Sequence, residues 1–293
     1  MATAALGPSF SGAVRGEILK LSRQLSLWLS LAGAVVLFAV IVLAISGSAN
    51  LKPMLLADPT QWAYDKLETF GTVFQIGSGI FLLIFGSRLL GMEYSSGTIR
   101  ILYARGMGRL QLLLAKLMTL AVMGMLLLAG YLVLAGAILG LMIVALSGSL
   151  DPLQHISREF WSDVGRWTVV QGISMGMAIL IAAAAAALGR SLAFGLAAAL
   201  AFYPVDNFVN ILEVLGIRAT GHTQPWTAIS QYQLSPNLNV ALELLEPTHR
   251  ARPAFAAPLA AVDATHALVV IGLFALIFAI IAVARTVRPD VLE

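Results

Sequence analysis

Long runs of apolar residues recur along this chain, and the shorter stretches between them hold most of its charge. A bilayer core about 30 Å thick needs about 20 helical residues, because each adds about 1.5 Å. Six runs reach that length, and they predict an all-α, polytopic membrane protein with a single domain over residues 1–293. The predicted spans are 25–46, 69–90, 117–146, 167–188, 191–212 and 264–284.

The fifth run contains a proline and an acid, Pro204 and Asp206. Proline removes a backbone donor and clashes with the preceding turn, so we expect the helix to break at residues 204–207. Asp206 would then cap a re-entrant piece over 208–215. A contact with a cation or a transported solute is the second interpretation of Asp206. Residues 216–263 predict a further interfacial or re-entrant helix before the sixth span.

Composition supports the membrane assignment. Hydrophobic residues make up 59% of the chain and charged residues 11%, against roughly 25% charged in soluble proteins. The absence of cysteine excludes disulfides and thiolate metal sites, and the four histidines show no metal-ligand spacing. A net charge of +3 is too weak to indicate nucleic acid as a partner.

Basic residues are unevenly distributed between alternate loops. With the N-terminus inside, the inner segments hold eleven Lys and Arg against four carboxylates, and the outer segments hold seven against eleven. Cytoplasmic loops retain Lys and Arg, so this bias predicts that both termini are cytoplasmic.

A short amphipathic pattern precedes the first span. Its apolar residues recur at helical spacing, and its basic residues lie elsewhere around the turn. We expect either an interfacial helix or an ordinary basic flank that orients the first span. The apolar positions are Phe10, Val14, Ile18 and Leu21.

The segment 91–109, between spans two and three, mixes charge with apolar residues. The positive-inside rule explains basic residues here, but it does not require an acid or a break rich in small residues. A short helix that docks into a cleft of a cytoplasmic partner is the alternative interpretation. The candidate residues are Glu93, Gly97, Thr98, Arg100, Arg105 and Arg109.

This pattern resembles the membrane subunits of type 2 ATP-binding-cassette (ABC) transporters. The resemblance rests on Glu93, then Gly97-Thr98-Ile99-Arg100, then Gly106, Arg109 and Lys116. It implies that 91–109 is a coupling helix in a groove of a separate ATPase subunit, and that the chain is a permease, most often an exporter in a prokaryotic cell membrane.

The resemblance also implies roles for residues and partners. Glu93 and Arg100 would position the coupling element, Arg105 and Arg109 would meet acidic groups or lipid phosphates, and Gly97 and Gly106 would supply turns. A second permease copy or a homologue and membrane lipid are further expected partners.

ATP binding is not expected on this chain. A P-loop requires Gly-Lys followed by Ser or Thr, and no Gly-Lys dipeptide occurs in the sequence. We therefore expect no cofactor here, with ATP and Mg²⁺ bound by the partner ATPase.

Polar residues at membrane depth are candidates for a transport path. They are Gln75 and Ser78 in span two, Gln171 in span four, and Asp206 and Asn207 in span five. Hydrogen bonding between helices is the alternative role for the neutral ones.

Two other functions compete with transport. Gly172-Ile173-Ser174-Met175-Gly176 matches a nucleophile motif, and His266 lies just inside span six, so an intramembrane serine protease is one alternative. The expected depths of Ser174 and His266 match poorly, which disfavours it. A membrane scaffold without transport activity is the other.

Overall fold

The computed structural model describes residues 9–46, 51–245 and 257–288. Within these ranges the chain forms helices and turns, with no strand. In chain order the helices are α1 Phe10–Ser22, α2 Leu25–Ser46, α3 Leu51–Ala57, α4 Pro59–Ser95, α5 Thr98–Ala104, α6 Arg109–Ser147, α7 Asp151–Gln154, α8 Arg158–Gly189, α9 Leu192–Thr220, α10 Gln224–Ser230, α11 Leu234–Leu245 and α12 Ala264–Val287.

Six of these helices, α2, α4, α6, α8, α9 and α12, are long and apolar enough to cross a membrane. This confirms the predicted all-α, polytopic fold. Large apolar side chains on the helices are widely exposed, such as Leu25 at 71% and Val133 at 74%. A surface of this kind is stable against lipid but not against water.

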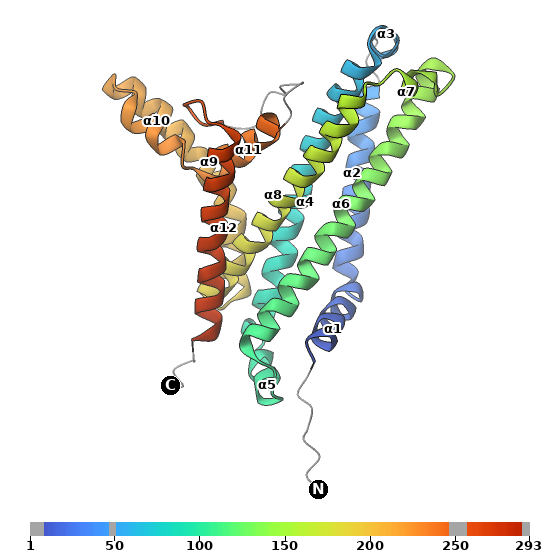
Figure 1. The fold of residues 1–293 in the computed structure, drawn as a ribbon. Coiled ribbons are helices and arrows are strands. Elements are labelled where there is room, and N and C mark those ends of the chain that lie inside the picture. The colour runs from blue at the N-terminus through green and yellow to red at the C-terminus, as the bar shows by residue number, and fades with distance from the viewer. Residues whose placement is uncertain (1–8, 47–50, 246–256, 289–293) are drawn as a thin grey trace.

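The helices define two ends of the molecule (Figure 1). The helices α1 and α5 lie at one end, together with the C-terminal end of α12, and we call this the α5 end. The helices α3 and α7 lie at the opposite end, which we call the α7 end. The helices α10 and α11 lie toward the α7 end, between the last two long helices in the chain.

Short polar residues and glycines set the helix boundaries. Asp58 caps α4 by accepting from the Gln61 backbone, and Ser157 and Ser191 cap α8 and α9 in the same way. Such caps satisfy backbone donors that have no partner inside the helix. Gly148 ends α6 with a φ of 83°, in the left-handed region that glycine adopts readily.

The core is centred on α4 and α8. A Cβ placed on Gly86 of α4 would lie 2.8 Å from the Cβ of Ala182, so the two backbones pack at a distance that only glycine permits. The alanines from Ala182 to Ala187 are all buried. The alanine run therefore serves close helix packing.

The predicted break in the fifth span is wrong. Helix α9 continues through Pro204 to Thr220, so no separate re-entrant piece forms over 208–215. The helix contacts α4 and α8 before the proline, and α10 and α11 after it. The Asn207 side chain donates to the Tyr203 carbonyl across the same turn, at 2.8 Å. Asp206 does cap a helix, but it is α11, through a hydrogen bond of 2.5 Å from the Ser235 backbone.

The turn between α8 and α9 abuts the end of α4. Arg190 adopts a φ of 45°, and Leu192 starts α9 directly afterwards. The Leu192 backbone donates to the Ser95 hydroxyl at 2.9 Å, and a Cβ on Gly91 would lie 2.8 Å from the Leu192 Cα. The last turn of α4 is therefore fixed against the α8–α9 turn.

Candidate functional site at the α5 end

Helix α5 is a short helix of seven residues between the long helices α4 and α6. Gly97 and Gly106 precede and follow it with φ values of 68° and 84°. Both values lie in the left-handed region, where a side chain adds strain. The two glycines therefore supply the turns that the sequence predicted, and they separate α5 from α4 and α6 (Figure 1).

One face of α5 is anchored and the other is open. Ile99 is buried, whereas Arg100 and Arg105 are exposed. The Thr98 hydroxyl lies 2.9 Å from the Ser96 hydroxyl, at the start of the helix. Two predicted basic residues thus lie on an exposed surface at the tip of the molecule, where they are accessible to a partner.

Glu93 lies instead in a cluster of four charges, of which Glu17, Glu93 and Lys116 are buried and Lys20 is exposed. Its Oε1 accepts from Lys20 of α1 at 2.9 Å and pairs with Lys116 of α6 at 3.0 Å. Lys116 also pairs with Glu17 of α1 at 3.2 Å. We call Glu17, Lys20, Glu93 and Lys116 the charge quartet.

The charge quartet is internally balanced, with two acids and two lysines. Lys116 is only 3% exposed, and its ammonium group donates to Glu17 and to the Leu89 carbonyl, at 3.2 Å and 2.7 Å, besides its pair with Glu93. An ammonium group has three donors, so all of them have partners. Buried charges are tolerated when they are paired and hydrogen-bonded in this way.

Lys20 titrates under the influence of two carboxylates. Burial favours its neutral form, but the hydrogen bond to Glu93 and the charges of Glu17 and Glu93 outweigh that effect. The pKa of Lys20 is therefore raised above its ordinary value. The ionic link between α1 and α4 stays intact at physiological pH.

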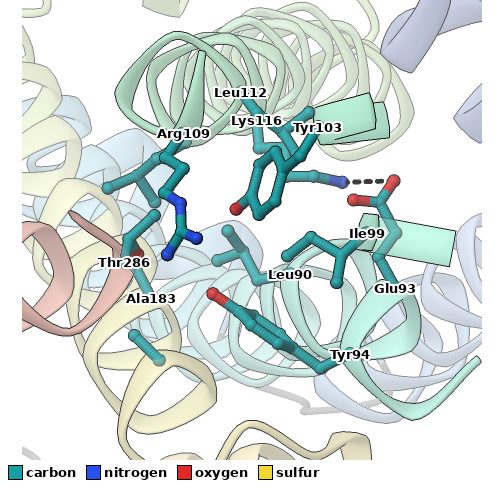
Figure 2. Close-up of a pocket in the computed structure, with 12 residues that line it drawn as sticks. Leu90, Glu93, Tyr94, Ile99, Tyr103, Arg109, Leu112, Lys116, Ala183 and Thr286 are labelled. Carbon is teal, nitrogen blue, oxygen red and sulfur yellow. Dashed lines mark ion pairs between the residues drawn. The ribbon is translucent and has the colours of Figure 1, made fainter. Parts of the chain in front are cut away.

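A small cavity lies beside the charge quartet (Figure 2). It is lined by residues of α4, α5, α6, α8 and α12, and its volume of about 20 Å³ matches a water molecule and no larger solute. Arg109 extends across it, stacks over the Tyr103 ring at 5.1 Å and donates to the Arg288 carbonyl at 2.7 Å. Arg109 therefore joins α6 to the end of α12 and to α5, a structural role in addition to the predicted contact with a partner or lipid.

Sequence reasoning did not predict that Glu17, Lys20 and Lys116 would meet Glu93. It counted both lysines among the inner basic residues and used Lys116 in the family resemblance, but it paired neither with an acid. The sequence did contain one signal for this pairing. Glu17 and Lys20 lie one helical turn apart and are adjacent to apolar residues, and Lys116 is likewise flanked by apolar residues. Opposite charges in such settings are candidates for pairing across helices.

The predicted path residues do not form one site. Gln171 donates to Ser78 at 3.1 Å and links α8 to α4, and Gln75 is half-buried one turn away on α4. Asp206 and Asn207 lie on α9, beside α11. The Gln171–Ser78 bond is the interhelical hydrogen bond that the sequence offered as the alternative role.

The protease pair gains no support from the observed contacts. The His266 Nε2 atom lies 2.9 Å from the Gln231 carbonyl, and its ring packs on Tyr232. Ser174 is half-buried in the middle of α8. The His266 contacts place that residue with the α10–α11 turn near the α7 end.

Comparison with known proteins assigns the family. Residues 13–207 match the family model described as ABC-2 family transporter protein, which is more than half of the 293 residues. No curated protein matches the chain. The matched range includes the whole charge quartet and α5. The chain therefore belongs to the ABC-2 transporter family and is a membrane permease subunit.

Proposed function

We propose that this permease subunit exports a solute, driven by ATP and Mg²⁺ bound on a separate ATPase that docks at the α5 end. The observation that carries the proposal is the combination of an exposed, basic α5 with the largely buried charge quartet behind it. The quartet connects α1, α4 and α6, and Ile99 anchors α5 to the same region. A push on α5 would therefore reach three helices at once.

The proposal places the α5 end in the cytoplasm of a prokaryotic cell. Arg100 and Arg105 lie there, as do the basic residues at the end of α12. This distribution follows the positive-inside rule. A second permease copy or a homologue would complete the membrane unit, with lipid around the exposed apolar faces.

Cysteine labelling tests the orientation. The natural chain has no cysteine, so single-cysteine variants at Arg105 and at Ser149 carry the only reactive thiols. In intact cells a membrane-impermeant maleimide should label Ser149→Cys and spare Arg105→Cys, and inverted vesicles should reverse the pattern. Labelling of Arg105→Cys in intact cells contradicts the proposal.

Copurification tests the coupling. The permease is expressed with its cellular ATPase, and the yield and ATP hydrolysis rate of the complex are compared for the wild type and for Arg100→Ala/Arg105→Ala. We expect a loss of at least tenfold in copurified ATPase activity, because two exposed cations of the docking helix are removed. Arg158→Ala is the matched control, since Arg158 is an exposed arginine that starts α8, near the α7 end.

Each outcome decides between two functions. If the double variant loses ATPase and the control does not, α5 is the docking element. If no ATPase copurifies with the wild type under any condition, the transport proposal gives way to the scaffold.

A further inference from the structure

A second buried polar cluster lies toward the α7 end, between α9 and the α10–α11 segment. It consists of Asn210, Glu213, Ser230 and Gln233, and we call it the Glu213 cluster. Each of these side chains is more than nine-tenths buried, and Glu213 is only 1% exposed. Glu213 lies 21 residues after the start of α9 at Leu192, or about 32 Å along the helix axis.

All contacts of the Glu213 carboxylate in the described structure come from neutral donors. Gln233 donates its Nε2 to Oε1 at 2.9 Å, and Asn210 donates its Nδ2 to Oε2 at 3.5 Å. Ser230 accepts from Asn210 and from the Leu259 backbone, which leaves its own hydrogen free to donate to Glu213. Donors of this kind favour the ionised form of a carboxylate, and they offset part of the cost of burying its charge.

No positive charge pairs with Glu213 among the described residues. The salt bridges there join the charge quartet and the Arg166–Asp163 pair, and Glu213 takes part in none of them. Asp206 is the nearest acid on the same face of α9, two turns away, and its own carboxylate is occupied by the Ser235 backbone. His266 of α12 contacts the Gln231 carbonyl instead.

An unsatisfied oxygen lies beside this carboxylate. Gln233 is 6% exposed, and its Oε1 has no hydrogen-bond partner in the described structure. Because Oε1 shares one carbon with the nitrogen that donates to Glu213, it is held next to the carboxylate. A buried acceptor without a partner is costly, and oxygen acceptors gathered around one negative charge are what a hard cation binds.

We propose that the Glu213 cluster is a binding site for a small monovalent cation, with Glu213 supplying the charge and the Oε1 of Gln233 supplying a neutral oxygen. One free carboxylate balances one positive charge. A divalent ion would draw on more acids, and no group of three His, Cys, Asp or Glu residues suited to a metal occurs in the described ranges. An alkali ion and the ammonium group of a solute share this chemistry, and the inference does not depend on the ATPase.

Thermal unfolding of the purified full-length chain in detergent tests the site. Sodium chloride, potassium chloride and methylammonium chloride are titrated separately against choline chloride at constant ionic strength. A ligand that binds only the folded state raises the unfolding midpoint in a saturable way. We expect at least one of the three cations to do so for the wild type and to have no such effect on Glu213→Gln.

Two further variants make the test specific. Glu159→Gln removes an exposed acid that follows the start of α8 and should keep the full cation response. Gln233→Met keeps the side-chain length but removes the amide oxygen together with the Nε2 donor to Glu213, and it should shift half-saturation to at least tenfold higher cation. It also provides an answer if Glu213→Gln fails to fold.

The outcomes separate the sources and the alternatives. A response to sodium or potassium alone assigns an inorganic ion, and a response to methylammonium alone assigns an amine of a solute. If the wild type responds to no cation more than to choline, or if Glu213→Gln and Gln233→Met both respond like the wild type, the proposal is wrong. A response to pH alone is also contrary to it, because a proton would then balance Glu213.

Discussion

Two polar clusters at opposite ends of this permease each contain buried carboxylates, but the groups around those carboxylates differ. In the charge quartet, Glu17 and Glu93 are each within 4.0 Å of both Lys20 and Lys116. In the Glu213 cluster, the acid is as deeply buried but meets only amides and a hydroxyl in the described structure.

The difference separates a structural use of buried charge from a binding use. A balanced set of ions neutralises its own charge and holds three helices together, so it leaves no net charge for a ligand. A buried acid that meets no positive charge among the described residues remains costly until a cation binds it. A buried glutamate therefore takes part in ion pairs between helices at the α5 end, whereas at the α7 end it belongs to the proposed cation site.

Removal of one lysine from the charge quartet should have the largest effect. Lys116→Met leaves Glu17 and Glu93 buried with Lys20 alone, and the free energy of unfolding should fall by about 3–5 kcal/mol. Denaturant titration of the purified protein in detergent measures it. The exposed Lys52 provides the control, and Lys52→Met should change the free energy by less than about 0.5 kcal/mol.

A double variant sharpens this result. Glu93→Gln/Lys116→Met removes one charge of each sign, so it should be more stable than Lys116→Met alone. If the decreases in unfolding free energy for Glu93→Gln and for Lys116→Met add up to the decrease for the double variant, the residues do not act as a balanced group.

The same substitution, glutamate to glutamine, should have opposite signs in the two clusters. In choline medium Glu213→Gln should raise the free energy of unfolding by about 1–2 kcal/mol, because it removes an uncompensated buried charge. Glu93→Gln should lower it, because it leaves two lysines with one acid. Paired denaturant titrations measure both, and a fall for both variants would show that the clusters are alike.

Glycine at the turns of α5 should matter less than the charge quartet. Gly97→Ala places a side chain at a φ of 68° and should cost about 1–2 kcal/mol. Gly79→Ala is the control in the helix interior of α4, where a Cβ meets nothing within 4 Å, and it should be neutral or slightly stabilising. Equal effects of the two variants on the unfolding midpoint would mean that turn geometry does not position α5.

The smallest expected effect is the titration of Lys20. Its pKa is raised, so its contribution to stability is fully present below its ordinary value of 10.5 and is lost as pH rises through the folded-state pKa. Thermal unfolding between pH 8 and pH 12 should therefore show a steeper decline for the wild type than for Lys20→Arg, whose guanidinium stays charged. Superimposable profiles would exclude a role for Lys20 in that decline.

The long helices were predictable because membrane spans have a length requirement that apolar runs reveal directly. The turns at Gly97 and Gly106 were predictable for a similarly local reason. The continuity of α9 was not, because contacts with α4 and α8 before Pro204 and with α10 and α11 after it outweigh the local cost of the proline. The meeting of Glu17 with Lys116 was also beyond local patterns, since 99 residues separate them.

The charge quartet also has a consequence for biosynthesis. Its members enter the growing chain in a fixed order, with Glu17 and Lys20 first, Glu93 next and Lys116 last. Until the ribosome has supplied the start of α6, the two acids have only Lys20 between them. The nascent chain therefore cannot complete the ion pairs of the charge quartet after two spans. Only when the third span is present can these pairs fix the earlier helices in their final arrangement.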